Sequence, residues 1–204
     1  MAQYAKTAAV RSGILDACLT IFGESGFHGA SMAEIARRAG ISHTGLLHHF
    51  PGKEDLLTAV LAMQDERSAD YLSRNAALDT TADPLDILRG MATTLIERDQ
   101  RIGLVELSAV LTGEATAPGH PAHDYFATRY RNIRSFMTRL FARLGDEGRL
   151  STDLPPAHLA ALMIATTDGL HTQWLFDREA IDVDACVSEL MATFVPELRV
   201  AKTD

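Results

Sequence analysis

Residues 31–50 constrain the fold more than any other part of the chain. Ser31-Met32-Ala33-Glu34 has the S-x-x-E form of a capping box, which predicts a helix that begins at Ser31. Gly40 can supply a left-handed C-terminal turn, Ser42 can cap a further helix, and Pro51 ends it. Two helices of about eight residues joined by a short turn are typical of a helix-turn-helix.

The apolar residues of this segment indicate which faces of the two helices meet. Leu46 and Phe50 lie at positions i and i+4, and we expect them to pack with Ile35 and Ile41 between the helices. The outer face of the second helix is then polar for the most part, and it would lie where a DNA major groove would be. This face carries His43, Thr44, Leu47 and His48.

The rest of the chain predicts an all-α fold of about nine helices, because apolar residues recur at helical spacing and β-branched alternation is absent. Gly23 and Gly26 should stop the first helix. We expect a DNA-binding domain over residues 1–56, with the helix-turn-helix at 31–50, and a second, larger helical domain over 57–204. Besides the two helices of the motif, the expected helices cover residues 7–22, 53 onward, 83–98, 102–115, 122–144, 155–176 and 182–195.

Charge separates the two predicted domains. The net charge is −8, yet residues 1–56 carry five cations and five anions, so the remaining residues carry 14 cations and 22 anions. We therefore expect a polyanion to bind the N-terminal part. No segment reaches the roughly 18 to 20 apolar residues of a membrane span, and the two cysteines have no metal-type spacing. We expect a cytoplasmic protein with no membrane partner, no metal and no cofactor.

A set of N-terminal residues carries a resemblance to a known protein family. The matching residues are Ile14-Leu15-Asp16-Ala17, Phe22-Gly23-Glu24-Ser25-Gly26-Phe27, Ser31, Ile35-Ala36, Ala39-Gly40-Ile41-Ser42, Leu46, His48-His49-Phe50 and Lys53-Glu54. They resemble the DNA-binding domain of the TetR/AcrR family of bacterial transcriptional regulators. The resemblance implies a homodimeric helical protein that binds a palindromic operator, usually as a repressor, and is released when a small molecule enters its C-terminal domain. It also implies that residues 57–204 bind the effector and form the dimer, and we therefore expect that the protein is not an enzyme. Residues 168–175 (DGLHTQWL) resemble the eighth helix of some members more loosely.

Two positions depart from the usual family pattern. The family has glycine and then threonine where this chain has Thr44-Gly45, so a glycine lies inside the recognition helix and lowers its helix propensity by about 1 kcal/mol relative to alanine. Leu47 replaces the usual tyrosine, which removes a phosphate hydrogen bond and allows apolar contact with a thymine methyl group.

DNA contacts are expected from nine residues. Ser31, Ser42 and Lys53 should hold phosphates, because they lie at helix N-termini, while the outer face of the second helix should read bases. The operator is expected to be double-stranded DNA with an inverted repeat. The expected contact residues are Ser31, Ser42, His43, Thr44, Gly45, Leu47, His48, His49 and Lys53.

The C-terminal domain offers candidates for an effector pocket and for a dimer interface. Deformable apolar side chains predict a pocket, and core packing is the alternative interpretation of each one. An apolar stripe at helical spacing predicts a two-fold interface through the last two helices. The pocket candidates are Met63, Met91, Leu95, Leu104, Leu107 and Met137, and the interface candidates are Leu159, Leu162, Met163, Thr166, Leu170, Trp174, Leu190 and Phe194.

Two other classes of protein are alternatives to a DNA-binding regulator. A helical enzyme could use His120, His123 and Asp124 as an acid–base cluster, although no phosphate loop, nucleophile elbow or HExxH spacing accompanies them. A helical scaffold that binds only other proteins is the second alternative. Salt-dependent binding to operator DNA distinguishes the regulator from both.

Overall fold

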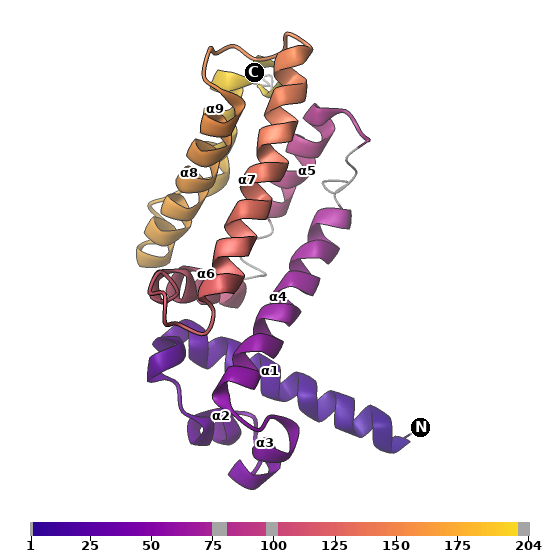
Figure 1. Cartoon of the computed structure of the whole chain (residues 1–204), viewed down its shortest axis with the longest axis vertical. Helices are drawn as coiled ribbons and strands as arrows, with labels where there is room; N and C mark the ends of the chain where they lie inside the picture. Colours follow the sequence, from indigo (N-terminus) through magenta and orange to yellow (C-terminus); the bar gives the residue numbers. More distant parts are fainter. Residues whose placement is uncertain (1, 75–80, 97–101, 200–204) are drawn as a thin grey trace. The chain divides into compact units, whose positions relative to one another are not determined.

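The computed structural model describes residues 2–74, 81–96 and 102–199. Over these residues the chain forms nine α-helices and no strand, as the sequence predicts, with a short 3-10 helix near the end (Figure 1). The helices are α1 (Ala2–Gly29), α2 (Met32–Arg38), α3 (His43–His49), α4 (Lys53–Arg74), α5 (Pro84–Ile96), α6 (Ile102–Glu114), α7 (His123–Asp146), α8 (Pro156–Phe176), α9 (Val183–Phe194) and η2 (Pro196–Leu198).

The chain divides into two compact units by packing. The first unit comprises residues 1–67 and 101–126, and the second comprises residues 68–100 and 127–204. The first unit therefore includes α6, which packs against α1, and it does not end at residue 56 as the predicted domain boundary does. The division into DNA-binding and effector domains remains a prediction about function.

Side-chain caps begin several helices where the sequence predicts them. Ser31 Oγ accepts the Glu34 N–H at 3.2 Å, and Ser42 Oγ accepts the Gly45 N–H at 3.0 Å. The expected reciprocal bond from the Glu34 side chain is replaced by an ion pair, because its carboxylate binds the Arg37 guanidinium in bidentate fashion at 2.8 and 2.5 Å. A bidentate hydrogen-bonded ion pair between a guanidinium and a carboxylate is stronger than a hydrogen bond from a neutral backbone N–H to the same carboxylate.

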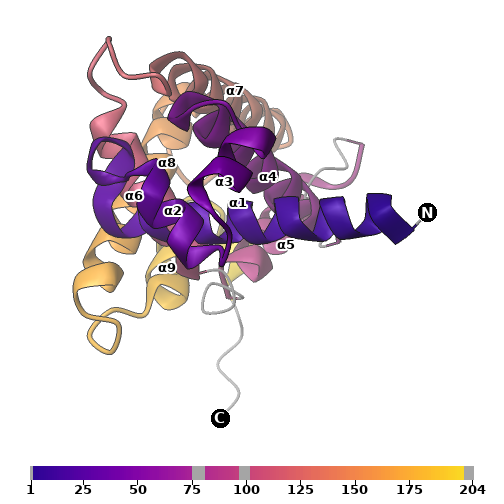
Figure 2. The ribbon, with the colours of Figure 1, turned by 90° about the horizontal axis from the view of Figure 1, so that it is seen from below.

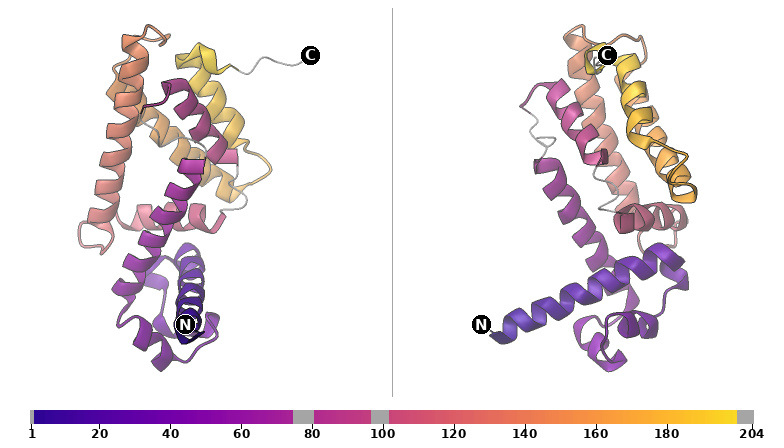
Figure 3. Two further views of the ribbon diagram at one scale, coloured as in Figure 1. Left: turned by 90° about the vertical axis from the view of Figure 1, so that its right-hand side faces the viewer. Right: turned by 180° about the vertical axis from the view of Figure 1, so that it is seen from behind.

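The first helix does not stop at Gly23, which corrects the sequence prediction. Gly23 is helical, and its missing side chain lets α6 approach. A β-carbon placed there would lie 3.3 Å from Glu106 Cβ and 3.4 Å from the Leu107 nitrogen. The break comes at Gly26, whose φ of 71° is a left-handed conformation that favours glycine. Figure 3 shows α6 lying across the C-terminal part of α1.

In the second unit α9 packs against both α5 and α8 (Figure 1). The buried core of the second unit includes one side chain from each of α5, α7, α8 and α9, namely Leu88, Phe141, Leu159 and Val187.

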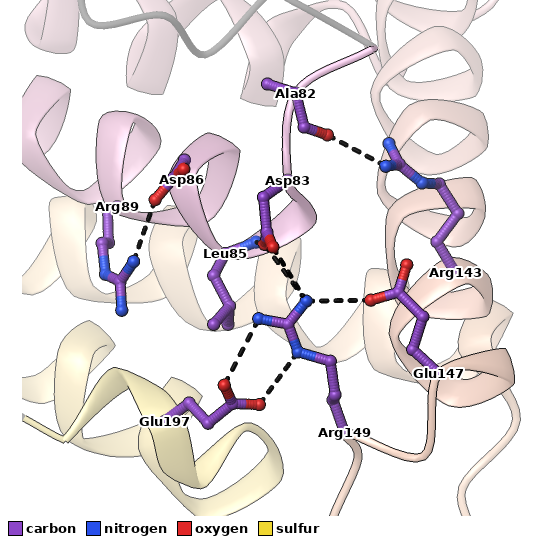
Figure 4. Close-up of polar contacts among 9 residues, drawn as sticks. All are labelled: Ala82, Asp83, Leu85, Asp86, Arg89, Arg143, Glu147, Arg149 and Glu197. Carbon is purple, nitrogen blue, oxygen red and sulfur yellow. Dashed lines mark hydrogen bonds and ion pairs between the residues drawn. The ribbon is translucent and has the colours of Figure 1, made fainter.

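A single guanidinium joins three parts of the second unit (Figure 4). Arg149 pairs with Asp83 at the start of α5 at 3.1 Å, with Glu147 after α7 at 2.8 Å, and with Glu197 in η2 at 2.9 Å. This guanidinium and the Leu85 N–H hold the pKa of Asp83 below its usual value. Arg149 therefore connects the start of α5 and the end of α7 to η2 near the C-terminus.

None of the helices in the described part of the chain is both long enough and apolar enough to cross a membrane.

Candidate nucleic-acid interface

The short helices α2 and α3 pack as a helix-turn-helix (Figure 2). Ile35, Leu46 and Phe50 are buried between them and the rest of the first unit. Gly40 has a φ of 69°, so the glycine expected at the turn adopts the left-handed conformation that the turn requires. Because Leu46 and Phe50 face inward, the opposite side of α3 is free for a ligand.

The predicted DNA-contacting residues are accessible to different degrees. The side chains of Ser31, Ser42, His43, Thr44 and His48 are exposed, and Leu47 is 40% exposed. Gly45, His49 and Lys53 are half-buried. The four outer-face side chains named in the sequence analysis therefore share one exposed surface of α3, defined here as the recognition face: His43, Thr44, Leu47 and His48.

Lys53, the first residue of α4, is bound within the first unit. Its ammonium donates to the carbonyl oxygens of Phe27 at 2.8 Å and Ala30 at 3.0 Å, and it lies 4.4 Å from the centre of the Phe27 ring. These bonds use two of the three donor hydrogens of a lysine. Sequence reasoning missed this internal role, because Phe27 and Lys53 are 26 residues apart.

The arginines near the recognition face also have intramolecular partners. Arg37 pairs with Glu34, and Arg38 pairs with Glu24 at 2.7 Å. The Arg11 guanidinium lies 4.2 Å from the centre of the Phe50 ring. Exposed ion pairs contribute little to stability, so a phosphate can replace either carboxylate at small cost. The local charge balance agrees with the neutral N-terminal segment seen in the sequence.

The histidines that suggested an acid–base cluster have structural contacts instead. His120 is buried, and its Nδ1 accepts the Ala122 N–H at 3.1 Å. His123 Nδ1 lies 2.8 Å from the Ala115 carbonyl oxygen, and Asp124 is exposed in the first turn of α7. Both imidazoles thus bind the backbone of the loop between α6 and α7.

The pocket candidates are divided between the two units. Leu104 and Leu107 are buried in the first unit, where Met63 is half-buried, and Met137 is buried in the second, where Met91 is half-buried. The side chain of Leu95 lies outside the described residues. The effector pocket remains a prediction.

The interface candidates fall into two groups. Leu159, Met163 and Trp174 are buried within the protomer, whereas Leu162 is 46% exposed. Thr166, Leu170, Leu190 and Phe194 are half-buried. Phe176, at the end of α8, is 90% exposed and was not among the candidates. The hydrophobic run of α8 thus serves the protomer core on one side and leaves apolar side chains exposed on another.

Comparison with known proteins matches both parts of the chain. Residues 14–60 match the family described as "Bacterial regulatory proteins, tetR family", and residues 84–199 match "BetI-type transcriptional repressor, C-terminal". The regulator AcrR of Shigella flexneri is 24% identical over 90% of this chain and 87% of its own length. RutR of Escherichia coli K12 is 48% identical over 26% of each chain.

Solved structures share the fold along nearly the whole chain. The complex of SmeT, from Stenotrophomonas maltophilia, with triclosan superposes with a TM-score of 0.74 at 23% identity, and the match covers 96% of each chain. An all-α fold with an exposed recognition face on α3 defines a helix-turn-helix regulator that binds DNA. The chain belongs to the TetR family of bacterial transcriptional regulators.

Proposed function

We propose that this regulator is a homodimeric repressor that acts in the cytoplasm and releases an inverted-repeat operator when it binds a small-molecule effector. The exposed recognition face of α3 carries the proposal, because Leu47 and three polar side chains lie where base edges can be reached. The BetI-type match over residues 84–199 and the structural similarity to SmeT, the repressor of a multidrug efflux pump, support repression.

Base reading and phosphate binding are assigned to different residues. The recognition face reads base edges, with Leu47 against a thymine methyl group, and Gly45 allows close approach. His49 lies at the end of α3 and contacts the DNA beside this face. Phosphates bind near Ser31 and Ser42 and at the remaining donor of Lys53.

The effector is assigned to the C-terminal part of the chain, and we expect an apolar or amphipathic molecule. Triclosan in the SmeT complex is an example of a small molecule bound by a structural neighbour. The helix α4 contributes residues to both compact units, since it begins at Lys53 and continues past Arg67. A ligand that tilts α4 would alter the spacing of the two recognition helices, with a coupling of about 5- to 150-fold in operator affinity.

Selection of duplexes from a random-sequence pool by the purified protein tests the DNA proposal. We expect enrichment of an inverted repeat whose half-sites lie about 34–36 Å apart, with affinity that falls as salt increases. Enrichment of a single half-site would contradict the dimer, and failure to enrich any sequence would contradict specific DNA binding.

Two matched variants assign the recognition face. L47A should lose the preference at one base pair, and each mismatched or lost contact costs about 1–3 kcal/mol. T58A changes an exposed hydroxyl on α4, away from the recognition face, and should leave the selected sequence unchanged. Equal effects of both variants would show that α3 does not read bases.

A further inference from the structure

The single helical turn of residues 27–30 leads directly into the helix-turn-helix. Gly26 breaks α1, and its carbonyl oxygen accepts the Ala30 N–H at 3.3 Å, so a new turn begins after the break. Ser31, the N-cap of α2, follows at once. The orientation of this turn therefore sets the direction in which α2 leaves α1.

The start of this turn needs a cap that Gly26 cannot supply, because glycine has no side chain. The cap comes from the carboxylate of Glu114, the last residue of α6. Glu114 Oε2 accepts the Phe27 N–H at 2.7 Å, and a β-carbon on Gly26 would clash with the Glu114 carboxylate. The carboxylate thus lies where a side chain on residue 26 would be, and it accepts the first of the N–H groups that have no partner within the turn.

The position of Glu114 on its own helix supports a specific role. A carboxylate at the C-terminal end of a helix faces the negative end of the helix dipole, which disfavours it. Here that cost is compensated at the N-terminal end of another turn, where a carboxylate is favoured. His120 lies beside it, because its buried Nε2 is 3.6 Å from Glu114 Oε2.

The other end of the turn is bound by Lys53, whose ammonium donates to the Phe27 and Ala30 carbonyl oxygens. The turn is therefore fixed at its start by α6 and at its end by α4. The Phe27 ring is buried and stacks edge-on against His28 and His120, with ring centres 5.5 and 5.3 Å apart.

We propose that Glu114 is a positioning residue for operator binding, because it caps the turn that orients the helix-turn-helix. The proposal rests on the DNA-binding function. Without an acceptor for the Phe27 N–H, only a fraction of the molecules hold the turn in its DNA-competent conformation. The apparent operator affinity falls in proportion to this fraction.

The pair E114Q and E114M tests this proposal, with a duplex selected by the wild-type protein as the probe. Both variants lose the charge and keep a side chain of similar length, but only glutamine offers an oxygen that accepts the Phe27 N–H strongly. We expect E114M to bind the duplex about tenfold more weakly than E114Q. Amide hydrogen exchange at residues 27–30 should rise in E114M and stay low in E114Q.

Two controls separate the possible explanations. D124N removes a charge from an exposed site in the same unit. Added to each E114 variant, it should leave the difference in duplex affinity between E114Q and E114M unchanged. If E114M has no cooperative thermal transition, E114A is compared with E114Q in the same way. Equal affinities of E114Q and its partner variant for the duplex would overturn the positioning role, whereas a wild-type protein that selects no duplex would contradict DNA binding itself.

Discussion

At the scale of single residues, His120 shows how burial sets a charge state. Its Nδ1 accepts a backbone N–H, so the proton of the neutral ring is on Nε2, directed towards Glu114. Burial lowers the pKa of His120 from its usual value, against the opposing effect of Glu114, and His28 lowers it further. Folding therefore favours the neutral form of this histidine, although a carboxylate lies beside it.

This histidine predicts a loss of stability in mild acid. The unfolded chain takes up a proton near pH 6.5 and the folded chain does so at lower pH, so the free energy of unfolding falls as pH drops through this interval. H120N keeps an acceptor near the Ala122 N–H and cannot be protonated. Thermal melting between pH 7.5 and 5 should show a steeper decline for the wild type than for H120N, and parallel curves would contradict the assignment.

At the scale of helices, the contact of α1 with α6 depends on Gly23. G23L should lower the free energy of unfolding by about 1–3 kcal/mol, because a side chain there meets Glu106 Cβ and the Leu107 backbone. G13L is the matched control, since a β-carbon at Gly13 meets nothing within 4 Å and leucine favours a helix by about 0.5–1 kcal/mol over glycine. Chemical denaturation of both variants measures the difference, and a G23L protein as stable as G13L would refute this role of Gly23.

The helices differ in how well the sequence predicts them. The starts at Ser31, Ser42 and Asp182 follow from caps that act within three residues, so local sequence was sufficient. The continuation of α1 past Gly23 depends on α6, which the local pattern does not contain.

The candidate site shows the same limit. The recognition face follows from the i, i+4 spacing of Leu46 and Phe50, whereas the bond from Phe27 to Glu114 joins residues 87 positions apart. Apolar periodicity in α8 also cannot distinguish a protomer core from a dimer interface. The pattern therefore predicts Leu159, Met163 and Trp174 as interface residues, although they are buried within the protomer. The sequence therefore predicts which face of a short capped helix is exposed. It does not predict which side chains bind each other across many residues of sequence.

At the scale of the whole molecule, the exposed apolar residues of α8 predict the oligomeric state. L162R should give monomers at micromolar concentration with an unchanged circular dichroism spectrum, because the side chain is 46% exposed and the protomer tolerates a charge there. A157R, at an exposed position off this stripe, should leave the dimer intact. Sedimentation velocity distinguishes the two, and a monomeric wild type would refute the interface.

The discontinuous first unit has a consequence for synthesis of the protein. Residues 1–67 and 101–126 fold together, so the N-terminal segment leaves the ribosome before the helix that packs on it exists. At about 5–20 residues per second, the 59 residues between positions 67 and 126 take roughly 3–12 s to translate. Until Glu114 has been synthesised within this interval, the Phe27 amide has no carboxylate partner, and a nascent chain interrupted before Glu114 lacks the contact that completes its DNA-binding end.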